Sequence, residues 1–316
     1  MSAAAPARLR LRLPATSANL GPGFDTAAVA LDFHLDVEAE PADAFSITAT
    51  GRDAKLCGQM ENNLVLDLYG RVLAENSRPI VPLSIRMHNE IPLGMGCGSS
   101  AAGRLAAIAM AAHFGELGWT GQQILFHAAA LEGHPDNVAA CWLGGFVAAA
   151  EAGGAIQVAR VVPPAAWRAI IVLPAEPLPT SQARAVLPEN YPRAHVVSNL
   201  QSVGLLGLAF AQARGDLLQV AMRDRVHQPY RAVICPLLAP LLPLSGTAGI
   251  LGVALSGAGP SVLVVVDGDG SVAEARSAIY NALSHLPKPD LLICRFQPDG
   301  AASISDGSDR ATALEA

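Results

Sequence analysis

The chain has 316 residues, of which 51% are hydrophobic and 15% charged, and its formal net charge is −6 at pH 7. This composition excludes a disordered chain, and the acidic balance argues against nucleic acid or an anionic membrane as the main partner. Five scattered cysteines without a Cys-x-x-Cys pair argue against a zinc site or a disulfide framework, which fits a reducing cytosol.

The first half of the chain is expected to contain strands interspersed with helices. Alternating apolar and polar residues predict strands at 8–13, 27–40, 45–50 and 83–88. Apolar residues at helical spacing predict helices at 63–75, 101–114 and 121–131. Asn62 and Thr120 are placed to cap the first and the third of these helices. Residues 144–150 and 156–162 are expected to close this half as a hairpin.

The second half begins at Pro163 and Pro164, which mark the best candidate for a domain boundary. Further strands are expected at 169–173, 250–255, 262–266 and 291–296, and further helices at 195–214, 216–225 and 272–286. The order lacks the regular alternation of a doubly wound sheet, so an α+β fold of two sandwiches is favoured. We therefore expect domains at 1–163 and 164–300, with a flexible tail at 301–316.

The uncharged stretch 232–266 is long enough to span a membrane. Four prolines and several glycines interrupt it, which favours buried helix, loop and strand over a membrane span. The amino terminus carries three arginines but no apolar leader segment before a cleavage site. We therefore expect a cytoplasmic protein.

A glycine-rich turn between a strand and a helix is the most informative segment. Gly94, Gly96 and Gly98 stand at alternate positions and are followed by Ser99 and Ser100. Glycine lets the backbone approach an oxyanion, and the first amides of a helix have no internal partner, so the segment is typical of a phosphate site. The lysine of a Walker A loop is missing. A purely structural turn and a dinucleotide-binding fingerprint (96–101, with Glu116 as the acidic residue) are the alternatives.

Glu132 ends the helix expected at 121–131, where the helix dipole disfavours an anion. A compensating cation is expected, and Mg²⁺ fits if phosphate is near. The alternative is a solvated glutamate. Pro135 suits the first position of a short helix, which places Asp136 and Asn137 in its first turn, where they could simply act as caps.

Two more glycine-rich turns lie at 19–25, between Asn19 and Asp25, and at 256–261. Arg184 and Arg231 lie in apolar surroundings elsewhere in the sequence. An ordinary β-turn and surface arginines are the alternatives for these features. Three glycine-rich turns that each join regular elements are nevertheless a stronger signal than any one of them.

In their order and spacing, segments 14–25, 92–102 and 256–261 resemble the three motifs of the GHMP kinases. Segments 132–137, 180–184 and 227–231 resemble the homoserine kinase branch of that family. Cys97 departs from the pattern, which usually has leucine there. The resemblance implies a two-domain GHMP kinase fold, with an N-terminal ribosomal-protein-S5-like domain and a C-terminal ferredoxin-like α/β sandwich. It also implies a cytoplasmic enzyme that forms homodimers.

The resemblance assigns ATP and Mg²⁺ as cofactors, with Mg²⁺ on Ser100 and Glu132. It assigns Asp136, Glu132 and Asn19 to catalysis, with Asp136 and Asn19 holding the acceptor hydroxyl. It assigns ATP to one continuous loop: Pro92, Leu93, Gly94, Met95, Gly96, Cys97, Gly98, Ser99, Ser100, Ala101 and Ala102. It assigns substrate to Asp25, Asn137, Thr180, Arg184, Arg231 and Gly259.

The implied reaction is ATP-dependent phosphorylation of the side-chain hydroxyl of L-homoserine, in threonine biosynthesis. Homoserine is a zwitterion, and the forked guanidinium groups of Arg184 and Arg231 suit its carboxylate while Asp25 suits its ammonium. The alternatives are a GHMP kinase for another small alcohol, such as mevalonate or shikimate, and a silent metabolite-binding protein of the same fold. A dinucleotide oxidoreductase is disfavoured because no strand leads to an acidic residue.

Overall fold

The computed structural model describes residues 8–303, and its larger sheet has seven strands. Its path is β11-β1-β2-β4-β3, while β5 pairs with β2 and with β6. These strands are β1 (Leu9–Asn19), β2 (Gly23–Pro41), β3 (Ser46–Gly51), β4 (Leu83–Asn89), β5 (Phe146–Ala152), β6 (Ala155–Val161) and β11 (Ala302–Ser303). Only the β3–β4 pairing is parallel among the pairings of this described sheet. The predicted hairpin is confirmed as β5 and β6.

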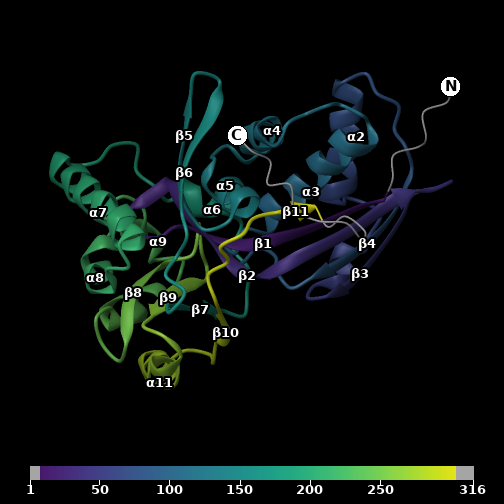
Figure 1. Cartoon of the computed structure of the whole chain (residues 1–316). Helices are drawn as coiled ribbons and strands as arrows, with labels where there is room; N and C mark the ends of the chain where they lie inside the picture. The colour runs from purple at the N-terminus through teal and green to yellow at the C-terminus, as the bar shows by residue number, and fades with distance from the viewer. Residues whose placement is uncertain (1–7, 304–316) are drawn as a thin grey trace.

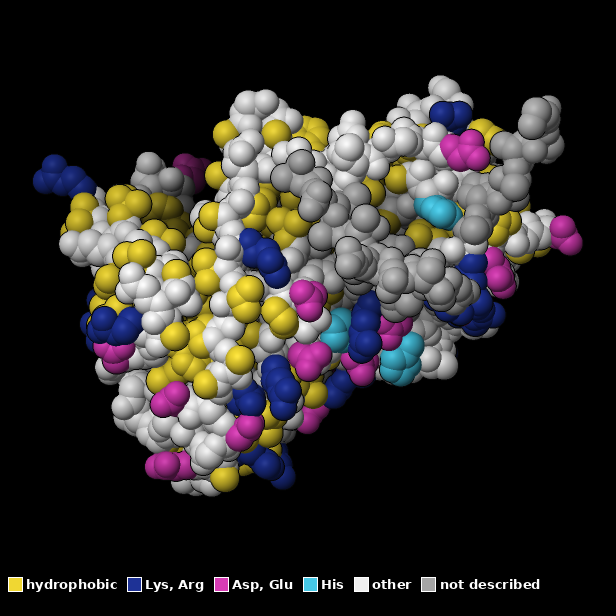
Figure 2. Space-filling model, in the orientation of Figure 1, with side chains coloured by type: hydrophobic (Ala, Val, Ile, Leu, Met, Phe, Trp, Pro, Cys, Tyr) yellow, Lys and Arg dark blue, Asp and Glu magenta, His cyan; other side chains and the backbone are white. Residues whose placement is uncertain are grey.

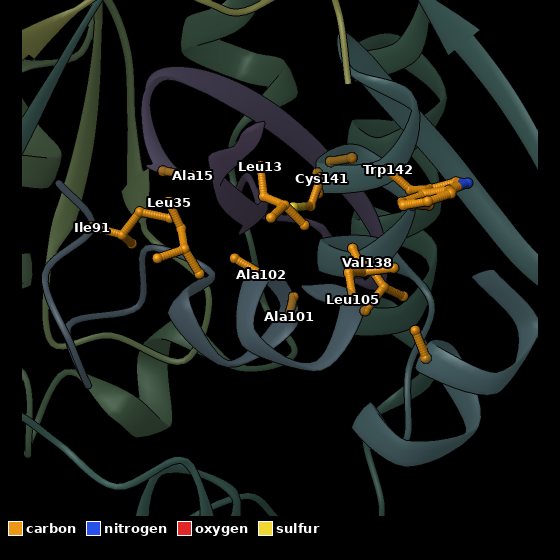
Figure 3. Packing of buried hydrophobic residues seen from close by; sticks show 14 of the residues in the cluster. Leu13, Ala15, Leu35, Ile91, Ala101, Ala102, Leu105, Val138, Cys141 and Trp142 are labelled. Carbon is orange, nitrogen blue, oxygen red and sulfur yellow. The ribbon is translucent and has the colours of Figure 1, made fainter. Parts of the chain in front are cut away.

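Helices cover one face of this sheet (Figure 1). They are α1 (Ala54–Cys57), α2 (Leu64–Glu75), α3 (Ser99–Phe114), α4 (Gly121–Glu132) and α5 (Asp136–Leu143). The alternation in strand β1 explains why only one face is covered. Leu9, Leu11 and Leu13 are buried on one face, whereas Arg10 and Arg12 lie on the other. Figure 3 shows Leu13 packed among side chains of α3 and α5. This packing fixes the start of α3 against the sheet.

The second sheet has four antiparallel strands in the order β10-β7-β9-β8. They are β7 (Arg168–Leu173), β8 (Ile250–Leu255), β9 (Val262–Val266) and β10 (Asp290–Cys294). Alternate residues of β7 enter two different cores: Ile171 belongs to the core shared with the first sheet, and Ile170 to a second core. Burial on both faces explains why β7 and β9 are continuous apolar runs.

The remaining helices lie on or beside the second sheet. They are α6 (Thr180–Ala185), α7 (Arg193–Ala211), η1 (Gly215–Leu217), α8 (Leu218–Ala221), α9 (Gln228–Arg231), α10 (Leu238–Leu241), η2 (Leu242–Leu244), η3 (Asp269–Ser271) and α11 (Val272–Ala282). Leu206 and Phe210 of α7 belong to the larger core, whereas Leu238 of α10 and Ile279 of α11 belong to the second core. The larger core thus extends from the first sheet to one face of the second sheet.

Several predicted helix boundaries were wrong for identifiable reasons. Asn63, not Asn62, caps α2, because its Oδ1 accepts hydrogen bonds from the amides of Val65 and Leu66. The helix expected at 216–225 ends at Ala221. The carboxylate of Asp224 accepts hydrogen bonds from the next amides, including that of His227, which stabilises a turn in place of a helix. Thr120 caps α4 as predicted.

The carboxyl-terminal stretch returns to the first sheet. Gln297 donates from its amide to Ala30 O at 2.9 Å, and Ala301 to Cys141 O at 2.9 Å. A flexible tail was expected from residue 301. Ala302 and Ser303 instead pair with β1 and extend the edge of this sheet. Residues 304–316 lie outside the described part of the chain. The expected boundary at residue 163 falls between β6 and β7.

One described helix, α7, is long and apolar enough to cross a membrane by length and composition alone, with a mean hydropathy of 1.3. Only 28% of this apolar window is buried, and its buried residues pack against the larger core. The uncharged stretch 232–266 forms short helices and two sheet strands, as predicted.

Candidate active site

The three glycine-rich turns meet at a single cavity of about 420 Å³. The amide of Gly257 in the third turn donates to Ala18 O at 3.0 Å, and the amide of Thr16 donates to Cys97 O at 3.1 Å. Ser256 Oγ donates to Gly96 O at 2.7 Å. Segments far apart in the sequence are therefore joined by hydrogen bonds around one site.

The glycine loop is held by these neighbours more tightly than the sequence indicated. A Cβ on Gly98 would lie 1.9 Å from Thr16 Oγ1, and one on Gly96 would lie 2.3 Å from Ser256 O. Both glycines also have positive φ, 74° and 77°, which disfavours other residues. Glycine is therefore required at these two positions by contact with protein backbone and side chain, in addition to any role in ligand approach.

The start of α3 faces the cavity. Gly98 precedes the first turn of the helix, and Leu93, Gly94, Ser99 and Ser100 also line the wall. The free amides and the positive end of the helix dipole make this end of the cavity suitable for phosphate.

Five residues that the sequence assigned to the ATP loop do not line this cavity. Cys97, Ala101 and Ala102 are buried in the core, as Figure 3 shows for the two alanines, and burial raises the pKa of the Cys97 thiol to about 12. Pro92 is also buried, and Met95 packs against the core. These side chains pack in or against the hydrophobic core and thereby hold the glycine loop in position.

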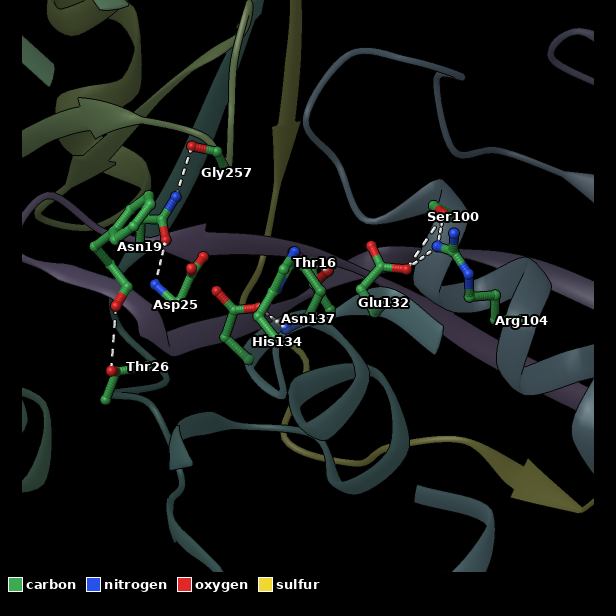
Figure 4. Close-up of polar contacts among 12 residues, drawn as sticks. Thr16, Asn19, Asp25, Thr26, Ser100, Arg104, Glu132, His134, Asn137 and Gly257 are labelled. Atoms are coloured by element: carbon green, nitrogen blue, oxygen red, sulfur yellow. Dashed lines mark hydrogen bonds and ion pairs between the residues drawn. The ribbon is translucent and has the colours of Figure 1, made fainter. Parts of the chain in front are cut away.

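Glu132 and Ser100 lie together at the phosphate end, as predicted (Figure 4). Ser100 Oγ donates to Glu132 Oε2 at 3.3 Å. Arg104, one helical turn after Ser100, donates to both the Ser100 hydroxyl and the Glu132 carboxylate. The positive charge expected beside Glu132 at the end of α4 is thus supplied in this structure by Arg104.

Asp136 lies deeper in the cavity and is 1% exposed. Its Oδ1 accepts from its neighbour Asn137 N at 2.6 Å and lies 2.5 Å from His134 Nδ1. Its Oδ2 is buried and has no hydrogen-bond partner among the described residues. Buried carboxylate oxygens are normally paired, so Oδ2 is available to a ligand group that donates a hydrogen bond.

Asn19 and Asn137 have structural partners. Asn19 Nδ2 donates to Gly257 O at 2.8 Å, and its Oδ1 accepts from the Asp25 amide at 3.0 Å. Asn137 Oδ1 accepts from Thr16 Oγ1 at 2.6 Å. Both residues also line the cavity, so each joins two walls of the site and still faces the cavity.

The opposite end of the cavity is charged. Arg184 of α6 and Asp25 form a two-armed ion pair. The Arg184 guanidinium lies over the Phe24 ring, with 5.6 Å from its central carbon to the ring centroid, and Arg231 lies at 5.3 Å from the same centroid. Thr180 and Gly259 line the cavity nearby.

Arg231 is buried and held in place by His227. Its Nε donates to Ala183 O at 3.0 Å and its Nη1 lies 3.2 Å from His227 Nδ1. His227 Nε2 lies 2.7 Å from Gly21 O, which can only accept, so Nε2 carries the hydrogen and Nδ1 is an acceptor for Arg231. Burial lowers the pKa of His227, which maintains this neutral form.

Sequence reasoning missed four kinds of residue here. Arg104 is the only Asp, Glu, Lys or Arg between positions 99 and 114, which could have identified it. His134 stands two residues before Asp136, within a motif that had been noted. Phe24 likewise lies within the noted segment 14–25, whereas no sequence pattern marks the apolar wall formed by Leu56, Leu64, Val65 and Met87 as part of a site.

Comparison with known families gives two matches. The chain matches the GHMP kinases N terminal domain over residues 63–145 and the GHMP kinases C terminal family over residues 208–285. The protein described as homoserine kinase from Solibacter usitatus is 43% identical over 277 residues, which cover 87% of this chain and 91% of that protein. The homoserine kinase from Deinococcus radiodurans is 36% identical over 280 residues, with 88% and 91% covered.

Solved structures show the same fold. A homoserine kinase from Cytophaga hutchinsonii superposes with a TM-score of 0.79 and 25% identity, covering 96% of this chain and 99% of that one. The Lactococcus lactis galactokinase, solved with galactose, gives a TM-score of 0.68 with 12% identity, covering 94% and 95% of the two chains. The two-domain architecture inferred from the three motifs is confirmed.

Proposed function

This chain belongs to the GHMP kinase family, and we propose that it is the kinase that transfers the γ-phosphoryl group of ATP to the side-chain hydroxyl of L-homoserine. The product is O-phospho-L-homoserine, an intermediate of threonine biosynthesis. Relatives described as homoserine kinases cover most of the chain, and their family comprises ATP-dependent phosphotransferases that act on alcohols.

The single observation that carries this proposal is the buried Oδ2 atom of Asp136. It lies in the same cavity as the phosphate end at Ser100 and the charged end at Arg184. An alcohol whose hydroxyl donates to Oδ2 would be held between the two ends. Holding an acceptor in line with a phosphoryl group can account for about 7–11 kcal/mol of the barrier. Asp136 thus has the position of a group that orients the hydroxyl and accepts its proton.

ATP is assigned to the other side of the cavity. Its phosphates fit the amides at the start of α3, and its base fits the apolar wall that includes Leu56, Val65 and Met87. An adenine ring needs such an apolar surface, and the wall is continuous with the glycine loop in one cavity. We infer that the base lies between α2 and β4.

Mg²⁺ is assigned to Ser100 and Glu132. A carboxylate and a hydroxyl form an oxygen donor pair, which suits this hard cation. When bound, the ion would neutralise charge on the phosphates during transfer. The Glu132 side chain is 11% exposed and ends a helix, so it is poorly solvated and favours a nearby positive charge.

L-Homoserine is favoured over other alcohols by the charged end of the cavity. Its carboxylate fits Arg184 and Arg231, and its ammonium fits Asp25. Exchange of the Asp25–Arg184 ion pair for contacts with a zwitterion leaves each charge paired. Mevalonate has a carboxylate without an ammonium, and shikimate likewise, so either would leave Asp25 without an opposite charge.

The same proposal includes a cytoplasmic enzyme that acts on small molecules and forms homodimers. On the face in Figure 2, Lys and Arg side chains lie beside Asp and Glu side chains and form no large patch of one sign. This distribution supports a partner other than nucleic acid for that face. Sedimentation or light scattering of the purified protein tests the dimer.

A coupled assay of ADP release with L-homoserine, mevalonate, shikimate and galactose tests the substrate. The account predicts that L-homoserine has the highest kcat/KM by a wide margin. A higher kcat/KM for another alcohol would assign the enzyme to a different branch, and ADP release from none of them would indicate a binding protein.

A further inference from the structure

We propose that Arg104 is an internal counter-ion that occupies the donor atoms of the metal site and makes metal binding depend on the nucleotide. The inference rests on the proposed assignment of Mg²⁺ to Ser100 and Glu132. It concerns a residue outside the three glycine-rich motifs, on the buried side of the phosphate end. Arg104 is a positioning residue by this reasoning, because it acts through Glu132.

The local structure brings Arg104 onto the two proposed metal ligands. Arg104 and Ser100 are four residues apart on α3, so their side chains lie on the same face of the helix. Glu132 reaches this face from the end of α4. The Arg104 guanidinium donates to the Ser100 hydroxyl and to Glu132 Oε2, the same oxygen that accepts from Ser100 (Figure 4).

Charge explains why an arginine belongs there. The Glu132 side chain is 11% exposed and the Arg104 side chain 24%, so neither charge is well solvated. The carboxylate also lies at the negative end of α4, where it needs an opposite charge. Both contacts come from one guanidinium nitrogen, Nη1, whose two hydrogens can serve the hydroxyl and the carboxylate together.

The same contacts oppose a bare metal ion. Mg²⁺ would need the oxygen lone pairs of Ser100 and Glu132 that accept hydrogen bonds from Arg104. A divalent ion entering beside the guanidinium would also meet a like charge at close range. The phosphates of a nucleotide supply the negative charge that draws the guanidinium away from Glu132. Metal would therefore enter effectively only together with nucleotide.

The test is the binding of Mn²⁺, used as a paramagnetic probe, to nucleotide-free protein by electron paramagnetic resonance. We expect Arg104→Met to bind Mn²⁺ about ten- to a hundredfold more tightly than wild type, the range that corresponds to a charge-assisted hydrogen bond. Addition of a non-hydrolysable ATP analogue should bring the two proteins much closer in affinity. Equal affinities of the two proteins without nucleotide would overturn the proposal.

A matched control separates the direct contact of Arg104 with Glu132 from a general effect of nearby positive charge on Mn²⁺ affinity. Arg71 lies on α2, pairs with Glu75 at the surface, and its charge acts on Arg104 from nearby. Arg71→Met removes one positive charge in the same region without touching Glu132, and it should leave Mn²⁺ affinity close to wild type. A gain as large as that of Arg104→Met would contradict the proposal, because the effect would then be long-range.

Two more variants make every outcome informative. The double variant with Arg104→Met and Glu132→Gln should lose the gain. If the double variant keeps the gain in Mn²⁺ affinity, the ion binds elsewhere and the metal assignment itself is wrong. If Mn²⁺ binding depends on Glu132 but is unchanged by Arg104→Met, only the role of Arg104 is overturned. If Arg104→Met does not fold, Arg104→Gln removes the charge but keeps a polar side chain, and it should still bind Mn²⁺ more tightly than wild type. Wild-type affinity in Arg104→Gln would then count against the proposal.

Discussion

Arg184 and Asp25 are paired with each other: Nη1 of the arginine lies 3.1 Å from Oδ2 and Nη2 lies 2.7 Å from Oδ1. The two residues are 159 positions apart and were assigned to opposite ends of one substrate. Their side chains are partly exposed, 39% and 31%, so a ligand can reach both. A zwitterion can exchange with this ion pair, whereas a simple anion would leave Asp25 without a cation. The pair thus favours an amino-acid substrate.

Arg184→Ala should raise the KM for L-homoserine by about ten- to a hundredfold, because a hydrogen bond to a charged group contributes about 1.5–3 kcal/mol. The KM for ATP should change little, since Arg184 lies at the opposite end of the cavity. Steady-state kinetics with each substrate varied in turn measures both values.

Arg214→Ala is the matched control for this prediction, since Arg214 forms a similar two-armed ion pair with Asp216 at the surface. It should behave as wild type. Homoserine methyl ester lacks the carboxylate charge and should lose little further affinity in Arg184→Ala. An equal loss for the ester and for homoserine would show that Arg184 acts on another group, such as phosphate.

Asp136→Asn should lower kcat by about two to four orders of magnitude, the usual contribution of a positioned acid or base. The amide keeps the shape of the side chain but cannot accept a proton from the hydroxyl. Binding of an ATP analogue, measured by calorimetry, should stay close to wild type. A kcat near the wild-type value would mean that the unpartnered Oδ2 has no part in the transfer.

Gly98→Ala should destabilise the protein much more than Gly118→Ala does. Both glycines have positive φ, so each alanine carries a backbone cost of about 1–2 kcal/mol. A Cβ on Gly118 meets nothing within 4 Å, whereas one on Gly98 would lie 1.9 Å from Thr16 Oγ1. Urea unfolding measures the difference. Equal losses of stability would show that β1 does not restrain the glycine loop.

Stability should fall as the pH is lowered below about 6.5, the ordinary pKa of histidine. Burial lowers the pKa values of both His34 and His227. Between the ordinary pKa and these lower values the unfolded chain binds more protons than the folded chain, so the free energy of unfolding decreases with falling pH. Protonation of His227 would also direct an N–H at Arg231.

Urea unfolding at about pH 7.5 and at about pH 5.5 measures this effect. His34→Gln should reduce the difference between the two pH values. His285→Gln alters an exposed histidine and serves as the control. The interpretation would have to be abandoned if His34→Gln and wild type lost the same stability on acidification.

Much of the fold was predictable because its signals are local. Strands β8 and β9 are bounded where their apolar runs begin and end, and α4 begins where Thr120 caps it. Helices α6 and α9 were not predicted, because four to six residues carry too little periodicity. These two helices present Arg184 and Arg231, so the geometry at the charged end of the site could not be derived.

The composition of the site was easier to predict than its contacts. The motif resemblance assigned Ser100, Glu132 and Asp136, and the structure places all three in one cavity. The Arg184–Asp25 ion pair and the contacts of Arg104 depend on how α3, α4 and α6 pack, which no local pattern specifies. The need for a cation at Glu132 was correctly inferred, but its source was an arginine that the sequence did not single out.

The most direct test of the central claim is phosphorus NMR of the products formed by wild-type enzyme from ATP, Mg²⁺ and L-homoserine. The account predicts ADP and a new phosphomonoester, O-phospho-L-homoserine, in equal amounts, with both signals nearly abolished in Asp136→Asn. ADP with inorganic phosphate and no phosphomonoester would contradict transfer to the homoserine hydroxyl.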